Sequence, residues 1–177
     1  MPELSVAALQ AIRSLVTAEG IDALQIDDLH DADLARLGWS GSPLHIKSVA
    51  AALERRATAE VDYLAVRAPG GEPIAKGGVD NANPRGPGML WQLATHPALQ
   101  SLGLGSALIA RLEDRIRRRG LRRAWLGVEI ENLRARVLYE RLGYEPFAEA
   151  IDGWEAQRED GSVYWYRTTL LLMQRHL

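Results

Sequence analysis

Residues 90–144 read LWQLATHPALQSLGLGSALIARLEDRIRRRGLRRAWLGVEIENLRARVLYERLGY, and this stretch decides the fold. It has the pattern of an apolar strand, a glycine-containing turn, a long amphipathic helix, a second strand and a shorter helix that stops at Gly143. A strand, a crossover helix and a second strand predict two neighbouring parallel strands. The long helix, which Gly120 ends, should bury an apolar ladder with four-residue spacing: Leu104, Leu108, Leu112 and Ile116.

The turn before the long helix is the most informative part of this stretch. Between Pro97 and Ser106 it places Gln100, Gly103 and Gly105 in the spacing Gln-x-x-Gly-x-Gly. Glycine lets the backbone adopt a positive φ and approach a ligand closely, and the following helix offers unpaired N–H groups at the positive end of its dipole. These features suit a phosphate or pyrophosphate. For this motif alone, a tight turn that needs glycine only for packing is the alternative.

Two motifs of this stretch resemble signatures of the GNAT acetyltransferase superfamily. Thr95-His96-Pro97 followed by Gln100-x-x-Gly103-x-Gly105 resembles its acyl-CoA pyrophosphate loop. The second motif of the chain, which resembles the second signature of the family, is Leu126-x-Val128 followed by Asn132-x-x-Ala135-x-x-x-Tyr139-Glu140-x-x-Gly143-Tyr144. Two motifs in the right order, one strand and one helix apart, are more specific than either alone. The resemblance covers residues 90–144 closely, and residues 21–173 by the order of elements.

The resemblance implies one α/β (α+β) domain over residues 1–177 with the GNAT fold, a mixed sheet of six or seven strands flanked by helices. The acetyltransferase core should span residues 21–173, and residues 1–20 should form an added extension with a helix over 4–17. The expected strands span residues 23–29, 61–67, 73–80, 89–96, 123–129, 144–157 and 163–173. The expected core helices span residues 28–38, 43–57, 104–119 and 132–142.

Composition excludes several classes of protein. The 177 residues are 47% hydrophobic and 25% charged, as in soluble domains, and no apolar run approaches the roughly 18 residues of a membrane helix. The first twenty residues lack the pattern of a signal peptide, so we expect a cytoplasmic protein. The absence of cysteine excludes disulfides and a cysteine nucleophile, and the four histidines lack ligand spacing, so we expect no metal site.

Charge gives little sign of a polyanionic partner. The formal net charge is −2, so we expect neither nucleic acid nor membrane binding. Seven of the arginines fall within residues 111–123. Such a run is typical of a solvated helix face, and the alternative is a site for the 3′-phosphate of a cofactor or for an acidic partner.

The resemblance implies acetyl-CoA, or another short acyl-CoA, as cofactor. The fourth and fifth strands should diverge, so that the backbone of Leu93, Ala94 and Thr95 pairs with the pantetheine arm and one N–H polarises the thioester carbonyl. The pyrophosphate should bind the loop residues Gln100, Ser101, Leu102, Gly103, Leu104, Gly105 and Ser106. Asn132 is implied to contact the arm, and Tyr139 to contact the cofactor and donate a proton to the leaving thiolate. Free tyrosine has a pKa near 10 and is therefore protonated at neutral pH.

The general base and the acceptor site are less defined. Many relatives carry a glutamate on the fourth strand, where this chain has Trp91-Gln92-Leu93. Candidate bases, acting directly or through water, are Asp80, Glu129, His96 and His45. Candidate substrate contacts are Trp39, His45, Asp80 and Gln92. For Trp39 and His45 the alternatives are a packing tryptophan and a surface histidine.

The leading hypothesis is an acetyl-CoA-dependent N-acetyltransferase in which a primary amine attacks the thioester directly in a ternary complex. The alternative is a non-catalytic acyl-CoA-binding module or sensor with the same fold. A Rossmann-type nucleotide domain is disfavoured because Leu108 stands where the third glycine would lie. The acceptor can be a small-molecule amine or a peptide or protein amine, and a homodimer is possible.

Overall fold

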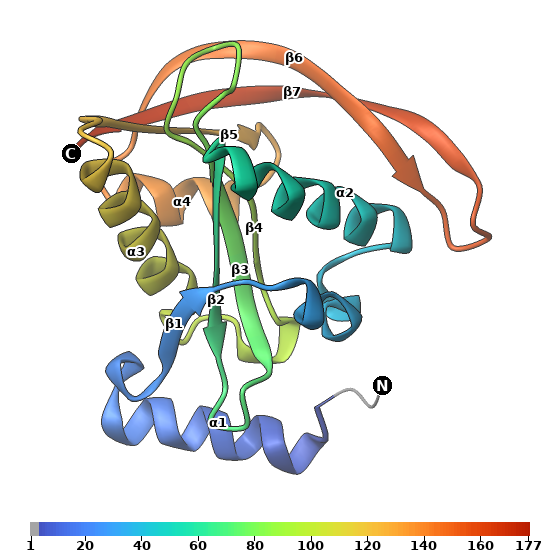
Figure 1. Ribbon diagram of the computed structural model, residues 1–177, viewed down its shortest axis with the longest axis vertical. Helices are drawn as coiled ribbons and strands as arrows, with labels where there is room; N and C mark the ends of the chain where they lie inside the picture. Colours follow the sequence, from blue (N-terminus) through green and yellow to red (C-terminus); the bar gives the residue numbers. More distant parts are fainter. Residues whose placement is uncertain (1–3) are drawn as a thin grey trace.

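The computed structural model describes residues 4–177, so the first three residues of the predicted extension lie outside the described part. A seven-stranded sheet with the order β1-β2-β3-β4-β5-β7-β6 forms its centre (Figure 1). Within the described chain, β4 and β5 are the one parallel pair of neighbours, and all other neighbours are antiparallel. The expected mixed sheet with flanking helices and an added N-terminal helix is confirmed.

The elements lie close to their predicted positions. The strands are β1 (Gln25–Asp28), β2 (Val61–Arg67), β3 (Pro73–Asp80), β4 (Met89–Thr95), β5 (Arg123–Glu129), β6 (Glu145–Gln157) and β7 (Val163–His176). The helices are α1 (Val6–Glu19), α2 (Pro43–Glu54), α3 (Leu104–Arg118) and α4 (Leu133–Arg141). Short 3₁₀ helices span Ile21–Ala23, Asp31–Arg36, Gly38–Ser40, Arg55–Thr58 and Pro97–Leu99.

Three differences from the predicted elements exceed two residues. The expected helix over residues 28–38 is replaced by two 3₁₀ helices, and α2 ends at Glu54 rather than at residue 57, where a 3₁₀ helix takes over. β7 continues beyond residue 173 to His176, because its polar end still pairs with β5 at Arg123. Ladder hydrogen bonds therefore extend a strand past the end of its apolar pattern.

The sheet separates two hydrophobic layers. α3 buries its predicted ladder against alternate residues of β2, including Leu64 and Val66. α2 packs Val49 and Leu53 against the intervening β2 residues, including Tyr63. Because side chains alternate across a strand, α2 and α3 cover opposite faces of the sheet (Figure 1).

The arginine run of α3 lies at the surface and is partly neutralised by the sheet edge. Arg115 donates to Asp28 of β1 at 2.8 Å, and Arg119 donates to Asp62 of β2 at 2.7 Å. These ion pairs attach α3 to the first two strands. No helix in residues 4–177 combines the length and apolarity needed to cross a bilayer.

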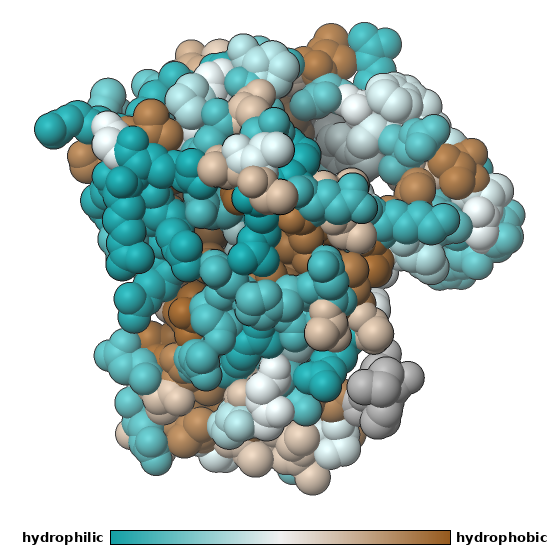
Figure 2. Space-filling view, in the orientation of Figure 1, coloured by the Kyte–Doolittle hydropathy of each residue, from teal (hydrophilic) through white to brown (hydrophobic). Residues whose placement is uncertain are grey.

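β6 and β7 form a long hairpin that arches away from the body (Figure 1). Its outer part carries exposed apolar side chains, including Ile151 at 60% and Trp165 at 66% exposure, and the space-filling view shows apolar residues on this arm (Figure 2). Near its tip, Gln157 Oε1 accepts a hydrogen bond from the Leu44 N–H at 3.1 Å. The hairpin therefore contacts the start of α2.

A buried carboxylate connects α3 to the elements that follow α4. Glu113 is 2% exposed, and both of its oxygens lie 3.0 Å from Nη1 of Arg175 on β7. The Tyr144 hydroxyl, just after α4, donates to Glu113 at 2.9 Å. Burial and the Glu113 carboxylate raise the pKa of Tyr144, so this phenol stays protonated as the donor.

We predict that Glu113→Ala lowers the free energy of unfolding by about 2–3 kcal/mol, because Tyr144 and Arg175 lose a charged acceptor. Urea unfolding measures this loss. The neighbouring Asp114→Ala is the control, since Asp114 forms an exposed pair with Arg117 and its loss should cost less than about 0.5 kcal/mol. Equal losses in the two variants would contradict the structural role of Glu113.

Candidate active site

The site begins where β4 and β5 separate. Over the described residues, their pairing is limited to Met89 opposite Trp125, and the two strands diverge beyond it. The His96 N–H donates to the Ile74 carbonyl of β3 at 2.8 Å, so His96 and Ala94 direct their backbone groups toward β3. By strand alternation, the backbone groups of Leu93 and Thr95 face the gap. The predicted divergence of the two parallel strands is confirmed.

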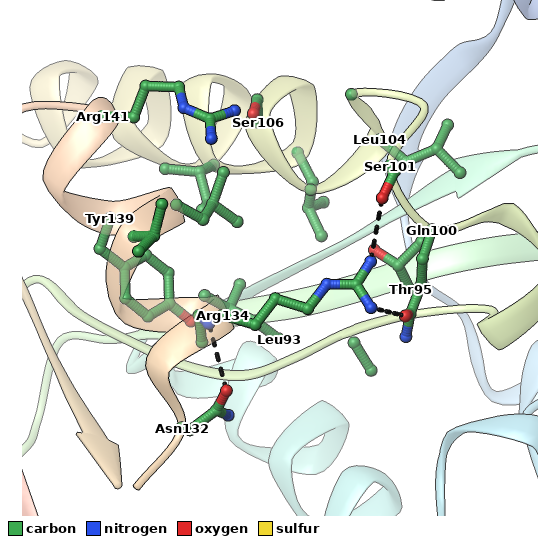
Figure 3. Close-up of a pocket in the computed structure, with 18 of the residues that line it drawn as sticks. Leu93, Thr95, Gln100, Ser101, Leu104, Ser106, Asn132, Arg134, Tyr139 and Arg141 are labelled. Carbon is green, nitrogen blue, oxygen red and sulfur yellow. Dashed lines mark hydrogen bonds between the residues drawn. The ribbon is translucent and has the colours of Figure 1, made fainter. Parts of the chain in front are cut away.

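A cavity of about 670 Å³ opens beside this gap, between the end of β4, the glycine loop, the start of α3 and one face of α4 (Figure 3). Of the residues predicted to bind the cofactor, all except Leu102 line this cavity. Leu102 packs against the main hydrophobic core instead. The two sequence motifs, separated by a helix and a strand, are therefore brought to opposite walls of one cavity.

The glycine loop presents backbone rather than side chains to the cavity. Gly103 precedes α3 with φ +85°, and no side chain caps this helix, so the N–H groups of its first turn have no partner within the helix. A Cβ on Gly105 would lie 3.7 Å from both Thr95 Oγ1 and Leu138 Cδ2, which is ordinary contact distance. Gly105 thus leaves room between β4 and α4 where a longer side chain would intrude.

Two arginines of α4 also line the cavity, and the sequence analysis missed both. Arg134 reaches across to the loop, where it donates to Gln100 Oε1 at 2.6 Å and to Ser101 Oγ at 3.1 Å (Figure 3). Arg141 lies seven residues, about two helical turns, further along α4 and also borders the cavity. Their seven-residue spacing is the same as that of Asn132 and Tyr139. This shared spacing is the sequence signal that could have predicted their place on the cavity wall. Together with the α3 N-terminus they make this end of the cavity suitable for an anion.

Asn132 and Tyr139 occupy the α4 wall. Asn132 is the N-cap residue of α4, and its Oδ1 accepts a hydrogen bond from the Ala135 N–H at 3.1 Å. Its side-chain amide nitrogen remains a donor beside the cavity. The Tyr139 ring lies 6.2 Å from that of Tyr144, and burial raises the pKa of Tyr139 to about 12. Tyr139 is therefore a protonated phenol at the cavity wall.

The α2 face of β4 holds a polar cluster that the sequence analysis did not predict. Lys76 of β3 is fully buried, and its Nζ lies 2.8 Å from His45 Nε2, 3.1 Å from the Tyr63 hydroxyl and 3.1 Å from the Gln92 carbonyl oxygen. Burial lowers the pKa of Lys76 to about 7. Burial and the Lys76 charge lower the pKa of His45 to about 4. An isolated lysine within a strand gave no signal for this cluster.

Two of the four predicted substrate contacts belong to this cluster, and two do not. His45 and Gln92 meet around Lys76, as described above. The Trp39 ring lies 5.6 Å from that of His96, and its Nε1 donates to the Pro73 carbonyl at 3.1 Å. Asp80 pairs with Met89 in the ladder, where β4 and β5 are still joined. It lies away from the divergence.

The two carboxylate candidates for a general base already have partners. Asp80 accepts from Nη1 and Nη2 of Arg55 at 3.2 and 2.8 Å. Glu129, at the end of β5, accepts from the Tyr166 hydroxyl at 3.0 Å. The Arg55 guanidinium therefore already engages both oxygens of Asp80, and the Tyr166 hydroxyl engages Glu129.

The family comparison identifies residues 26–144 as matching the model described as the acetyltransferase (GNAT) family. The mycothiol acetyltransferase of Beutenbergia cavernae is 48% identical over 61 residues, which are 34% of this chain and 20% of that protein. The [ribosomal protein bS18]-alanine N-acetyltransferase of Escherichia coli strain K12 is 42% identical over 55 residues, which are 31% of this chain and 37% of that protein. The chain therefore matches only the minor part of either relative.

The fold is also that of solved N-acetyltransferases. The crystal structure of the ribosomal-protein-S18-alanine N-acetyltransferase from Escherichia coli superposes with a TM-score of 0.65. The alignment covers 86% of this chain and 93% of that chain at 23% identity. At this identity the likeness establishes the shared architecture.

The lowered pKa of buried Lys76 should make the free energy of unfolding depend on pH. Between the folded pKa of about 7 and the ordinary value of 10.5, the unfolded chain holds a proton that folded Lys76 has released. The free energy of unfolding should therefore rise with pH in this window, by at most about 1.4 kcal/mol per pH unit. Urea unfolding at several pH values in the lower half of the window measures the slope.

Lys76→Met should remove this slope. Lys47→Met is the matched control, because Lys47 is the other lysine of the chain and lies exposed on α2. An unchanged slope in Lys76→Met would show that another group titrates.

Proposed function

The chain belongs to the GNAT family of acetyltransferases, and on this premise we propose that it transfers the acetyl group of acetyl-CoA to a primary amine. The observation that carries the proposal is the divergence of β4 and β5 beside a cavity whose far wall is the N-terminus of α3. It provides an unpaired strand edge and unpaired helix N–H groups at the two places where an acyl-CoA needs them.

The residues present fit an acyl-CoA. The N–H groups at the start of α3 would hold the pyrophosphate, with Arg134 and Arg141 as charged donors and Gly105 leaving the space open. The exposed backbone of Leu93 and Thr95 would pair with the amide groups of the pantetheine arm. Asn132 would contribute its side-chain amide to the same arm. A volume of about 670 Å³ lies within the usual range for small-ligand sites.

Acetyl-CoA supplies an activated thioester when it is bound. The Leu93 N–H would polarise the thioester carbonyl as the amine nitrogen forms its bond to the carbonyl carbon and the carbon–sulfur bond breaks. Tyr139 would give its proton to the departing sulfur. The raised pKa of about 12 keeps this proton in place until it is needed.

The proton released by the amine needs an acceptor or a path to water. Each of the predicted bases already has a partner. Arg55 binds Asp80 and Tyr166 binds Glu129. Lys76 Nζ lies 2.8 Å from His45 Nε2, and the Ala98 N–H donates to His96 Nδ1 at 3.3 Å. Burial and Lys76 lower the pKa of His45 to about 4, so its ring is neutral at physiological pH but is a weak proton acceptor. An amine that reaches the site deprotonated would need no residue for this step.

We infer that the acceptor is a primary amine of a small molecule or of a polypeptide. The names of the relatives that match parts of this chain refer to a small molecule, mycothiol, and to an alanine of a ribosomal protein. A panel of amines should therefore include small amines and a peptide with N-terminal alanine. Release of CoA in the steady state, with acetyl-CoA binding confirmed by calorimetry, tests the proposal. Binding without turnover of any acceptor would favour the acyl-CoA sensor instead.

We predict that Gly105→Val abolishes acetyl-CoA binding and leaves the fold nearly intact. The Cβ itself fits at 3.7 Å from its neighbours, but the branched methyl groups would occupy the space between Thr95 and Leu138. Calorimetry measures the affinity. Ala110→Val is the control, because Ala110 is an exposed residue of the same helix that does not line the cavity. Retained binding by Gly105→Val would refute the assignment of the loop.

We predict that Tyr139→Phe lowers kcat about 100-fold and leaves the Kd for acetyl-CoA nearly unchanged, because the ring stays and only the acidic proton is lost. Steady-state kinetics and calorimetry separate the two effects. Tyr164→Phe serves as control, since Tyr164 stacks with Arg158 on the distant hairpin. An undiminished kcat would remove Tyr139 from the role of acid.

A further inference from the structure

A bulge interrupts the pairing of β3 with β4 beside the site. Lys76 pairs with Ala94 and Gly78 pairs with Trp91, so Gln92 and Leu93 together face Gly77. Gln92 has φ +52°, a left-handed conformation that non-glycine residues rarely adopt. Such a residue persists where its surroundings fix it, and bulges of this kind redirect the groups of a strand next to active sites.

The surroundings fix Gln92 through both its side chain and its backbone. Gln92 Oε1 accepts from the Tyr63 hydroxyl at 3.1 Å, and its Nε2 donates to Ser48 Oγ at 2.8 Å. The backbone carbonyl accepts from Lys76 Nζ at 3.1 Å. Tyr63, which also contacts Nζ, joins the two sets of bonds. The only groups of this cluster that titrate are Lys76, His45 and Tyr63.

The direction of the Gln92 carbonyl determines the direction of the next amide. In a trans peptide the C=O and the following N–H point to opposite sides. Lys76 holds the Gln92 carbonyl on the α2 face of the sheet, so the Leu93 N–H points away from Lys76, toward the side on which Leu93 lines the cavity. The Leu93 side chain lies on this side as well, because a Cβ on Gly77 would meet both Leu93 and Leu108.

We propose that Lys76 is a positioning residue, which holds the Gln92 carbonyl and thereby keeps the Leu93 amide directed at the acyl carbonyl in the cavity. This inference rests on the proposed function. Lys76 is fully buried and does not reach the cavity, so it acts through the peptide that joins Gln92 and Leu93.

The geometry allows Lys76 to hold this carbonyl whether its amine is charged or neutral. An ammonium has three N–H donors, and His45 Nε2, the Tyr63 oxygen and the Gln92 carbonyl are three acceptors at 2.8–3.1 Å. A neutral amine keeps two N–H donors and has a lone pair. This lone pair can accept a hydrogen bond from His45 when the imidazole carries its proton on Nε2. His45 therefore complements both forms of Lys76, and the bulge does not depend on one of them.

The test uses acetyl-CoA labelled with ¹³C at the acetyl carbonyl. In the wild-type protein, a hydrogen bond from the Leu93 N–H should move the ¹³C resonance of the bound acetyl carbonyl downfield. The reference is the resonance of a thioester carbonyl in an aprotic solvent, where it accepts no hydrogen bond. Lys76→Met, which has a similar length and no donor, should lose this displacement and lower kcat at least tenfold. Its Kd for CoA, which lacks the acetyl group, should stay within about threefold of the wild-type value. Lys47→Met should behave like the wild type in all three measurements.

A second variant separates loss of positioning from general damage. Glycine adopts a positive φ without strain, so Lys76→Met combined with Gln92→Gly should regain part of the carbonyl displacement and part of kcat. A carbonyl displacement retained in Lys76→Met overturns the proposal. Loss that Gln92→Gly does not restore also overturns it, because Lys76 would then act through something other than the bulge.

The same measurements distinguish this inference from the proposed function. Failure of the wild-type protein to bind acetyl-CoA refutes the proposed function and the inference with it. Binding with an undisplaced carbonyl in the wild-type protein refutes the inference alone.

Discussion

The structure depends on one departure from regular sheet pairing: β4 stays bonded to β3 while it separates from β5 beyond Met89 and Trp125. A sheet interior normally satisfies every backbone N–H and C=O, and buried groups without partners are costly. Leaving the edge of β4 open is therefore useful only where a ligand can complete the ladder. The open edge of β4 and the uncapped start of α3 both present backbone polar groups at the cavity. Those of β4 lack a neighbouring strand, and those of α3 lack a partner within the helix.

The two faces of the sheet contribute different groups around this opening. On the α3 face, the cavity combines backbone donors, two arginines and the protonated Tyr139, which suits an anionic molecule with a leaving group. On the α2 face, the buried cluster around Lys76 contacts the opposite side of the same peptide. A bulge in β4 lets one strand serve both faces, since it turns a carbonyl to one side and the next amide to the other.

Rigid connections hold the walls of the cavity in place. Glu113 joins α3 to β7 and to Tyr144, which follows α4, so a buried anchor connects α3 to the segment just after the other helix that borders the cavity. Arg115 and Arg119 join the other side of α3 to β1 and β2. A site built from backbone groups needs this support, because its geometry follows the position of whole elements rather than the rotamers of a few side chains.

The sequence by itself determined the order and type of nearly all elements, because hydrophobic periodicity and glycine stops such as Gly120 and Gly143 are local signals. It also predicted that the glycine loop and Tyr139 belong to one site, because their spacing resembles two motifs of the family, and both line the same cavity. Only the tertiary structure brought Lys76, His45, Tyr63 and Gln92 together, and only it placed Arg134 and Arg141 on the cavity wall. Those residues lie on different strands and helices, and contacts between distant elements depend on register and packing, which no short pattern encodes.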